Sequence, residues 1–333
     1  MKKYFYFSKK IKVLTLTLAA FICINAACKK KEGFVKTEGM IWNTLYHITY
    51  EGPATLQDSI IPVLREVEKS VSVFDSESLV TLLNQGESVE ADYHLQKVYD
   101  ESILINGLSA GMFDPTVGPL IDAWGFGLGH TPNSDTLAVD SVKAFVGIKK
   151  TRREGNKIIK DDARTRFNFS AIAKGYGCDA VGEMLLRNGV ENYMVEIGGE
   201  LALRGKSPSG KEWRIAVDAP VEDKNPGEET ALILNLTDVG VATSGNYRNF
   251  RVDGSGKSAH TISPVTGRPF ISEILSATVV ASSCMEADAI ATACMASSVE
   301  EAKTLLEKTN AQGLLIFADS VWYSPGFARY VDH

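Results

Sequence analysis

The stretch ADAIATAC, residues 287–294, lies near the carboxyl end of the chain, in a segment whose pattern predicts a pair of helices over 285–307. In a helix, Asp288 and Thr292 are one turn apart and lie on the same face. A carboxylate and a hydroxyl group on one face are oxygen ligands that suit a hard cation. The stretch therefore predicts a metal-binding pair. The ordinary alternative is a helix charge beside a threonine that bonds to its own backbone.

Two polar stretches precede this helix, ATSGNYRNF at 242–250 and HTISPVTGRPF at 260–270, each placed between apolar, strand-like runs. Hydroxyl groups, glycine and Arg248 in the first stretch can bind phosphate, although a polar hairpin turn has the same composition. His260 begins the second stretch, where a ligand would lie, although a lone histidine is more often structural. The composition of both stretches favours a phosphate-bearing ligand.

The stretch FSAIAKGYGCD, residues 169–179, predicts a helix that begins at Ser170 as its N-cap. Free amide groups in the first turn and the charge of Lys174 would attract an anion. Small neighbours, Ala173 and Gly175, would let a ligand approach Lys174. The alternative is a surface lysine on an amphipathic helix.

Two weaker motifs complete the set. EIGGE, at 196–200, places two glycines between strand-like runs, which is typical of a bulge or a tight turn that approaches a ligand. FDPTVGPL, at 113–120, places Asp114 before a proline at a helix start, and an Asx-type turn explains this residue equally well.

The first 27 residues predict a lipoprotein signal peptide. Five lysines precede an apolar run that is shorter than a membrane-spanning helix, and small residues precede Cys28. We expect cleavage before Cys28, acylation of its thiol and a short charged tether over 28–38, so that the protein is anchored on the periplasmic side of a bacterial membrane. The position of Asn25 departs from the usual leucine, and the alternative is an ordinary signal peptide with an incidental cysteine.

Charge and cysteine content narrow the function classes. Of 35 basic residues, five lie in the signal peptide, which leaves 30 against 41 acidic residues and a net charge of −11. This charge argues against a nucleic-acid partner. Three cysteines remain beyond Cys28, namely Cys178, Cys284 and Cys294. Ten residues along one helix separate the last two beyond disulfide range, so we interpret all three as small buried residues.

The chain predicts one mixed α/β (α+β) domain over 39–333, with no repeats and no linker. Helical periodicity covers four segments, 53–71, 92–108, 171–187 and the pair at 285–307, and Asn188 and Gly189 end the third. Strand patterns cover the segments 193–197, 201–204, 213–217, 231–236, 239–243, 276–281 and 314–318, with two short strands between 157 and 169.

Together, FDPTVGPL, SAIAKGYGCD, EIGGE, ATSGNYR, HTISPVTG and ADAIATA resemble the ApbE-type FAD:protein FMN transferases in order and spacing, from about Thr44 to Phe317. SVFDSESLVTLLN, at 72–84, resembles the region that covers the flavin in this family. The resemblance implies one ApbE-like domain with mixed sheets flanked by helices.

The family further implies that Mg²⁺ is bound by Asp288, Thr292 and the backbone carbonyl of Ala171. The implied reaction is the attack of a threonine or serine hydroxyl of another protein on FAD, which leaves FMN attached and releases AMP. Lys174 would neutralise phosphate charge, and His260 is the candidate base, with Asp288 able to cooperate. The residues implied to bind FAD are Thr44, Asp114, Ser170, Lys174, Glu196, Gly198, Gly199, Ser244, Asn246, Tyr247, His260 and Thr266.

One departure concerns the segment Trp42, Asn43, Thr44, where the family usually has Met-Gly-Thr. Asparagine tolerates a positive φ, so the backbone turn is compatible with this sequence. Trp42 in place of methionine changes the packing around the flavin.

Three other functions fit parts of the pattern: an FAD pyrophosphatase that uses water as the nucleophile, a lipoprotein that stores FAD, and a purely structural lipoprotein. The combination of Asp288, Thr292 and His260 favours chemistry over storage. The chain has no segment of the flavin-acceptor type, so the acceptor would be a partner with an exported FMN-binding domain, for example a subunit of an ion-pumping electron-transfer complex.

Overall fold

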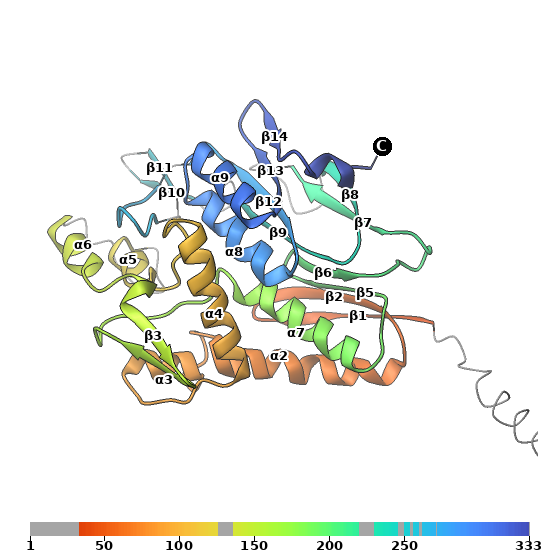
Figure 1. Cartoon of the computed structure of the whole chain (residues 1–333), viewed down its shortest axis with the longest axis horizontal. Helices are drawn as coiled ribbons and strands as arrows, with labels where there is room; N and C mark the ends of the chain where they lie inside the picture. Colours follow the sequence, from red (N-terminus) through yellow and green to blue (C-terminus); the bar gives the residue numbers. More distant parts are fainter. Residues whose placement is uncertain are drawn as a thin grey trace, which may run out of the picture.

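The structure is a computed structural model that describes residues 33–125, 136–219, 230–245, 250–253, 256–259, 262–270 and 272–332. Its centre is an eight-stranded sheet in the order β1-β2-β5-β6-β9-β12-β13-β14, with every neighbouring pair antiparallel (Figure 1). The strands are β1 (Phe34–Ile41), β2 (Thr44–Glu51), β5 (Tyr193–Ile197), β6 (Glu200–Arg204), β9 (Val239–Gly245), β12 (Ser276–Ala281), β13 (Gln312–Ile316) and β14 (Val321–Tyr323). Among the described residues, no helix has the length and apolar composition to cross a bilayer.

The hairpin of β1 and β2 supplies one edge of this sheet, and the sequence pattern did not predict it. Charged residues and a glycine interrupt the apolar alternation in FVKTEGMI, which weakens its strand signal. Trp42 and Asn43 form the two-residue turn, with φ of 50° and 59°. Positive φ at both turn residues is the conformation that a tight hairpin needs, so the expected turn is confirmed with asparagine in place of glycine. Because β1 begins at Phe34, the folded chain starts inside the segment 28–38 that we assigned to the tether.

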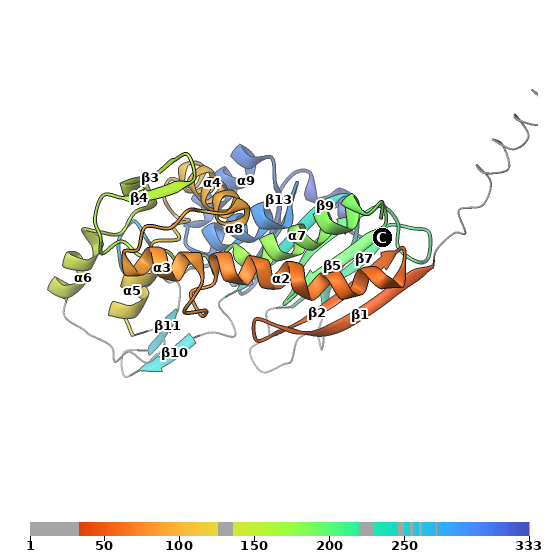
Figure 2. The same ribbon diagram turned by 90° about the horizontal axis from the view of Figure 1, so that it is seen from below.

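Helices cover one face of the sheet in two layers. The most extensive contacts with it are made by α7 (Ala173–Arg187) and α8 (Cys284–Met295), while α2 (Gln57–Val71) packs on α7 and α4 (Tyr93–Leu108) packs on α8. Figure 2 shows α2 running along the outside of this layer. The predicted helices at 53–71, 92–108 and 171–187 are therefore confirmed, and α8 with α9 (Val299–Thr309) confirms the pair at 285–307.

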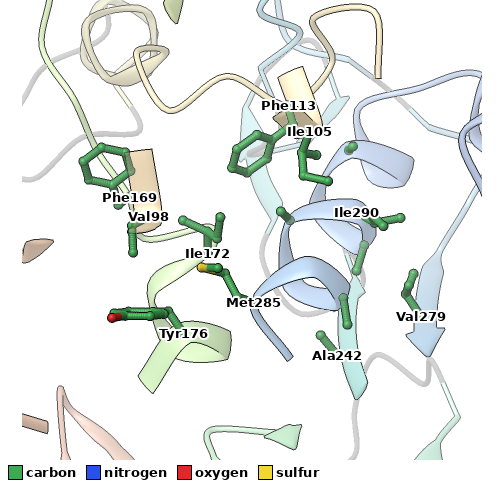
Figure 3. Packing of buried hydrophobic residues seen from close by; sticks show 14 of the residues in the cluster. Val98, Ile105, Phe113, Phe169, Ile172, Tyr176, Ala242, Val279, Met285 and Ile290 are labelled. Carbon is green, nitrogen blue, oxygen red and sulfur yellow. The ribbon is translucent and has the colours of Figure 1, made fainter. Parts of the chain in front are cut away.

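The largest apolar core lies between these helices and the sheet, where side chains from α4, α7, α8 and β12 interdigitate (Figure 3). Its fully buried members include Val98, Ile172, Val279 and Ile290. Alanines on both sides of α8 let the helix lie against the sheet, which is why a helix with little amphipathic contrast is buried almost all round. Local periodicity alone places such a helix in the core but does not select its partners.

A hairpin of β7 (Trp213–Asp218) and β8 (Thr230–Leu236) packs on the opposite face of the sheet. Predicted strands at 193–197 and 276–281 match the observed bounds, and those at 201–204, 213–217, 231–236 and 239–243 match to within two residues. The last predicted strand, 314–318, lies two residues earlier, at 312–316.

A small lobe lies beside α4, where the chain between the two main helical stretches folds back (Figure 1). It contains α3 (Leu79–Gln85), α5 (Gly118–Ala123), α6 (Thr136–Lys143) and the hairpin of β3 (Thr151–Glu154) and β4 (Lys157–Lys160). The remaining short elements of the described chain are the 3₁₀ turns η1 (Ala54–Leu56), η2 (Ile148–Lys150) and η3 (Phe327–Tyr330) and the strand pair β10 (Phe250–Asp253) and β11 (Gly256–Ala259). We predicted two strands between 157 and 169, but only β4 lies there; Phe167 and Phe169 are instead buried without strand pairing.

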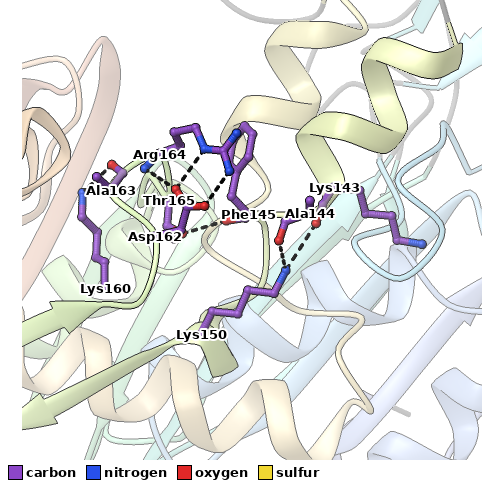
Figure 4. A network of polar contacts seen from close by, with 9 residues as sticks. All are labelled: Lys143, Ala144, Phe145, Lys150, Lys160, Asp162, Ala163, Arg164 and Thr165. Carbon is purple, nitrogen blue, oxygen red and sulfur yellow. Dashed lines mark hydrogen bonds and ion pairs between the residues drawn. The ribbon is translucent and has the colours of Figure 1, made fainter.

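Polar contacts tie the loops of this lobe together (Figure 4). Arg164 donates two hydrogen bonds to Asp162, at 2.7 and 3.0 Å, which together with a backbone bond lower the pKa of this carboxyl to about 2. Thr165 donates to the carbonyl of Phe145 at 2.7 Å, and Lys150 bonds to the carbonyl of Ala144. The Thr165 bond holds the β4–α7 loop against the residues that follow α6, and the Lys150 bond holds the next turn of the chain against them.

Candidate functional site

The close approach of α7 and α8 places the candidate residues together. A Cβ atom on Gly175 would lie 2.4 Å from the carbonyl oxygen of Cys284, so only glycine fits there. Asp179 accepts hydrogen bonds from the backbone amides of Cys284 and Met285, at 3.0 and 2.8 Å, and thereby anchors the first turn of α8 on α7. Gly175 and Asp179, one turn apart on α7, thus fix where the start of α8 lies.

Asp288 follows on α8 and is 3 % exposed. Its Oδ2 accepts from the amide of Gly175 at 3.1 Å, while Oδ1 has no hydrogen bond within the described residues. Burial raises the pKa of this carboxyl, although the charge of Lys174 and the Gly175 amide oppose the shift. A buried carboxylate with one uncommitted oxygen is suited to bind a cation.

Three oxygen atoms meet one turn further along α8. Thr292 Oγ1 lies 3.5 Å from the carbonyl oxygen of Ala171 and 3.5 Å from Ser244 Oγ. These separations exceed the usual 2.7–2.8 Å of a strong O–H···O bond, so the oxygens are held close without being committed to one another. Two of them, from Ala171 and Thr292, belong to the predicted metal ligands, and Ser244 was predicted only to contact FAD.

Lys174 and Glu200 form an ion pair on the other side of Asp288. Burial raises the pKa of Glu200 to about 7, and Asp288 adds to this rise while Lys174 opposes it. Burial disfavours the charged form of Lys174, but the attraction of the Asp288 and Glu200 carboxylates is stronger than this effect and raises the pKa of Lys174. Because two carboxylates face one ammonium group, the cluster carries an excess of negative charge.

Glu200 also has a buried Oε2 atom without a hydrogen-bond partner. An unsatisfied carboxylate oxygen inside a protein is costly unless a cation or a donor completes it. Within the described residues, no three acidic, histidine or cysteine side chains form a metal cluster of the zinc type. The oxygen-rich donor set of a carboxylate, a hydroxyl and a carbonyl fits Mg²⁺.

A cavity of about 570 Å³ opens beside this cluster and is lined by Ser170 and Lys174 together with residues of α2 and of the β1–β2 turn. Trp42 borders it, and the indole ring packs over Gly177, where a Cβ would lie 2.6 Å from the ring. The buried Nε1 of Trp42 has no hydrogen-bond partner. A larger groove of about 1230 Å³, which includes Trp213 and the loop 205–212, contains none of the predicted site residues.

The EIGGE turn lies next to the same hairpin. Glu196 Oε1 accepts from the amide of Gly199 at 2.7 Å, and Glu196 Oε2 lies 2.5 Å from Nδ1 of His47. Gly198 has φ of 62° and lies against Thr44, so that a Cβ at 198 would be 2.9 Å from Thr44 Oγ1. The predicted tight turn is therefore confirmed and brings Thr44, Glu196, Gly198 and Gly199 together.

The prediction that Ser170 caps α7 is wrong. The helix begins at Ala173 with Ile172 as its N-cap, and Ser170 lies in the preceding turn. The amides of Ala173, Gly175 and Tyr176 already bond to Phe169, Asp288 and Ile172. The first turn is therefore not an open anion site, because these three amides already have hydrogen-bond acceptors.

Asp114 lies in the Asx-type turn that was the ordinary alternative. It accepts from the amide and hydroxyl of Thr116 at 2.8 and 2.6 Å, and also from the Ile148 amide and Asn106. Burial raises the pKa of Asp114, and these bonds oppose the rise. Thr266 is exposed in a turn whose neighbour Gly267 accepts a bond from the Trp124 indole, in the small lobe. Contacts of either residue with FAD stay predictions.

Cys28, Asn246, Tyr247 and His260 lie outside the described residues. Glu200 and Asp179 were not predicted as site residues from the sequence. A signal for Glu200 was available, because an acidic residue that opens the apolar run LAL is unusual inside a buried strand. No local signal identifies Asp179, since its role depends on α8, more than a hundred residues later.

Comparisons with known proteins agree with this geometry. Residues 42–316 match the model of the ApbE family. A FAD:protein FMN transferase of Vibrio cholerae serotype O1 is 36 % identical over 328 residues, which are 95 % of this chain and 96 % of the relative. The solved flavin transferase ApbE of Vibrio cholerae superposes with a TM-score of 0.79 at 35 % identity, over 89 % of this chain and 99 % of that one.

The apo flavinyl transferase ApbE of Pseudomonas stutzeri superposes with a TM-score of 0.80 at 27 % identity, over 90 % of this chain and 97 % of that one. The family match covers most of the chain, including the α7–α8 cluster, the EIGGE turn and the cavity. The chain therefore belongs to the ApbE family.

Proposed function

We propose that this protein transfers the FMN moiety of FAD to a threonine or serine hydroxyl of a partner protein, with release of AMP, in a reaction that depends on Mg²⁺. Family membership supports the reaction class. The observation that carries the metal requirement is the meeting of Ala171, Ser244 and Thr292 oxygens beside the buried Asp288.

Different residues of this chain would bind the metal, contact the phosphates and orient the metal ligands. Asp288, Thr292 and the Ala171 carbonyl would hold Mg²⁺, whose charge would stabilise the pyrophosphate oxygens of FAD. Lys174 lines the cavity and has a 36 % exposed side chain, so its ammonium group can reach a phosphate while Glu200 fixes its position. The Gly175 amide holds one oxygen of Asp288 and orients the other.

A base is needed to take the proton of the acceptor hydroxyl, and His260 is the candidate from the sequence. Asp288 could cooperate, because burial raises the pKa of this carboxyl and so favours its taking up a proton. The rest of the FAD molecule would occupy the cavity beside the β1–β2 turn. Thr44, Glu196, Gly198 and Gly199 gather at the neighbouring EIGGE turn, within reach of a ligand that extends from this cavity.

We further propose that the protein acts on the periplasmic side of a bacterial membrane, anchored by lipid on Cys28. The partner would be a protein with an exported FMN-binding domain, for example a subunit of an ion-pumping electron-transfer complex. The support is the N-terminal sequence and the acidic net charge of the mature chain, which makes nucleic acid an unfavourable partner.

The test is to incubate the protein with FAD, Mg²⁺ and a candidate acceptor, and to measure both AMP and flavin fluorescence that stays on the acceptor after denaturation. We expect both signals, in equal amounts, and neither after chelation of Mg²⁺. AMP release at the same rate without acceptor would instead identify an FAD pyrophosphatase. Binding of FAD without AMP would identify a storage protein.

A further inference from the structure

Two of the three buried cysteines are neighbours across the α7–α8 contact. Cys178 on α7 and Cys284 at the start of α8 are fully buried members of one core cluster, and each thiol contributes to the pKa shift of the other. The other polar contacts of these thiols are to the carbonyls of Glu200 at 3.2 Å and of Val241 at 3.6 Å. Thiols are weak donors, so little is lost if these two bonds disappear.

The backbones at this point are close and fixed. Gly175, one turn before Cys178, touches the carbonyl of Cys284, and Asp179, the next residue after Cys178, binds the Cys284 amide. Contacts on both sides of Cys178 therefore hold the two cysteine backbones in register. Such proximity of two backbones is what a disulfide requires, since its Cα atoms lie about 4.4–6.8 Å apart.

We propose that Cys178 and Cys284 form a disulfide bond that links α7 to α8 when the chain folds in an oxidising compartment. The oxidant would be a disulfide of a small thiol or of a thiol–disulfide oxidoreductase. The two thiols lose two electrons and two protons to form one S–S bond, and the oxidant's S–S bond is reduced to two thiols. The presence of such an oxidant rests on the proposed export of the chain, and not on the transferase reaction.

The timing follows from burial. Burial raises the pKa of both thiols, and a buried thiol without thiolate character reacts slowly. Oxidation therefore precedes the closure of α7 on α8, and the finished bond resists reduction until the domain unfolds.

The bond would act on the candidate site through geometry. Lys174 is one turn before Cys178 on α7, and Asp288 is one turn after Cys284 on α8. A cross-link between them fixes the separation of the ammonium group from the carboxylate. Cys294, ten residues further along α8 and equally buried, has no thiol neighbour within the described residues and serves as the internal control.

The first test is to express the full chain with its own N-terminal segment, trap free thiols with an alkylating agent under denaturing conditions, and map peptides by mass spectrometry without reduction. We expect a linked pair of peptides that contain Cys178 and Cys284, lost on reduction, and alkylated Cys294. Full alkylation of Cys178 and Cys284 would overturn the proposal.

The second test compares thermal unfolding of the oxidised protein with that of protein reduced in denaturant and refolded in reductant, for the parent and the Cys178→Ala and Cys294→Ala variants. Because the closed loop exceeds a hundred residues, reductant should lower the Tm of the parent and of Cys294→Ala by about 5 °C and leave Cys178→Ala unchanged. Equal responses of the two variants would contradict a Cys178–Cys284 bond. Neither test measures flavin transfer, so failure of the disulfide and failure of the proposed activity are distinguishable.

Discussion

Two carboxylates and one ammonium group meet at the site, and the resulting excess of negative charge determines what the site can bind. Asp288 and Glu200 are both 3 % exposed, and Lys174 is the cation that faces them. An unpaired buried charge is unfavourable by several kcal/mol unless it takes up a proton or binds a cation. Burial raises the pKa of each carboxyl, which favours uptake of a proton. The neighbouring oxygens of Thr292 and Ala171 would help to bind a cation instead.

Asp288→Ala tests the metal site at this scale. The change removes the one carboxylate on the Thr292 face of α8, so we expect Mg²⁺-dependent AMP release to fall by at least about a hundredfold. Asp162→Ala is the control, because Asp162 is a half-buried aspartate whose partner is Arg164, outside the cavity. Its turnover should match the parent. Unchanged turnover in Asp288→Ala would remove the metal assignment.

Asp179 gives a pH prediction with a defined sign. Burial, opposed by the amides of Met285 and Cys284, raises its pKa from 3.8 to about 7. Between these values the unfolded chain has lost the proton that the folded chain keeps, so the free energy of unfolding falls as pH rises from about 4 to 7, by up to about 4 kcal/mol.

The check is denaturant unfolding of the parent and of Asp179→Asn across this pH range. The asparagine side chain does not ionise, so the fall in the free energy of unfolding should be smaller in the variant. Identical pH slopes in the two proteins would show that Asp179 ionises alike in the folded and unfolded chains.

At the scale of elements, the contact between α7 and α8 determines the site. One helix carries Lys174 and the other carries Asp288 and Thr292, and the absence of a side chain at Gly175 allows their approach. Close packing of this kind transmits a shift of even a fraction of an ångström to both sets of side chains.

Gly175→Ala therefore should lower the free energy of unfolding by about 2–4 kcal/mol and reduce turnover, since the new methyl group meets backbone that cannot move aside. Gly107→Ala is the matched control. Gly107 lies in α4, is exposed and has open space around its Cα, so alanine there should stabilise by up to about 1 kcal/mol through helix propensity. Chemical denaturation measures both, and equal stability of the two variants would contradict the packing argument.

At the scale of the whole molecule, the proposed membrane attachment would depend on a single thiol, that of Cys28. If Cys28 carries the lipid, Cys28→Ser should move the protein from the membrane to the soluble fraction after cell fractionation, because no described helix can span a bilayer. Transferase activity of the released protein should persist with a soluble acceptor. A variant that stays in the membrane fraction would show that another segment attaches it.

The sequence allowed most helices and the inner strands of the large sheet to be predicted, because their periodicity is local. The β1–β2 hairpin was missed because polar residues and Gly39 interrupt the alternation of apolar and polar residues in β1. The side chains of β2 are buried by residues of α2 and α7, which lie outside the hairpin. Ser170 was misplaced as a cap because a hydroxyl before a helical pattern is a frequent signal, and the chain here inserts a turn first.

The sequence by itself determined which side chains share a face: Asp288 and Thr292 are one turn apart whatever packs against them, and the paired glycines of EIGGE require a tight turn. Only the tertiary structure decided which faces meet. Ala171 and Thr292 are separated by 121 positions, and Lys174 and Glu200 by 26. The spacing within an element follows from backbone geometry, whereas contacts between elements depend on how apolar surfaces from the whole chain are buried together.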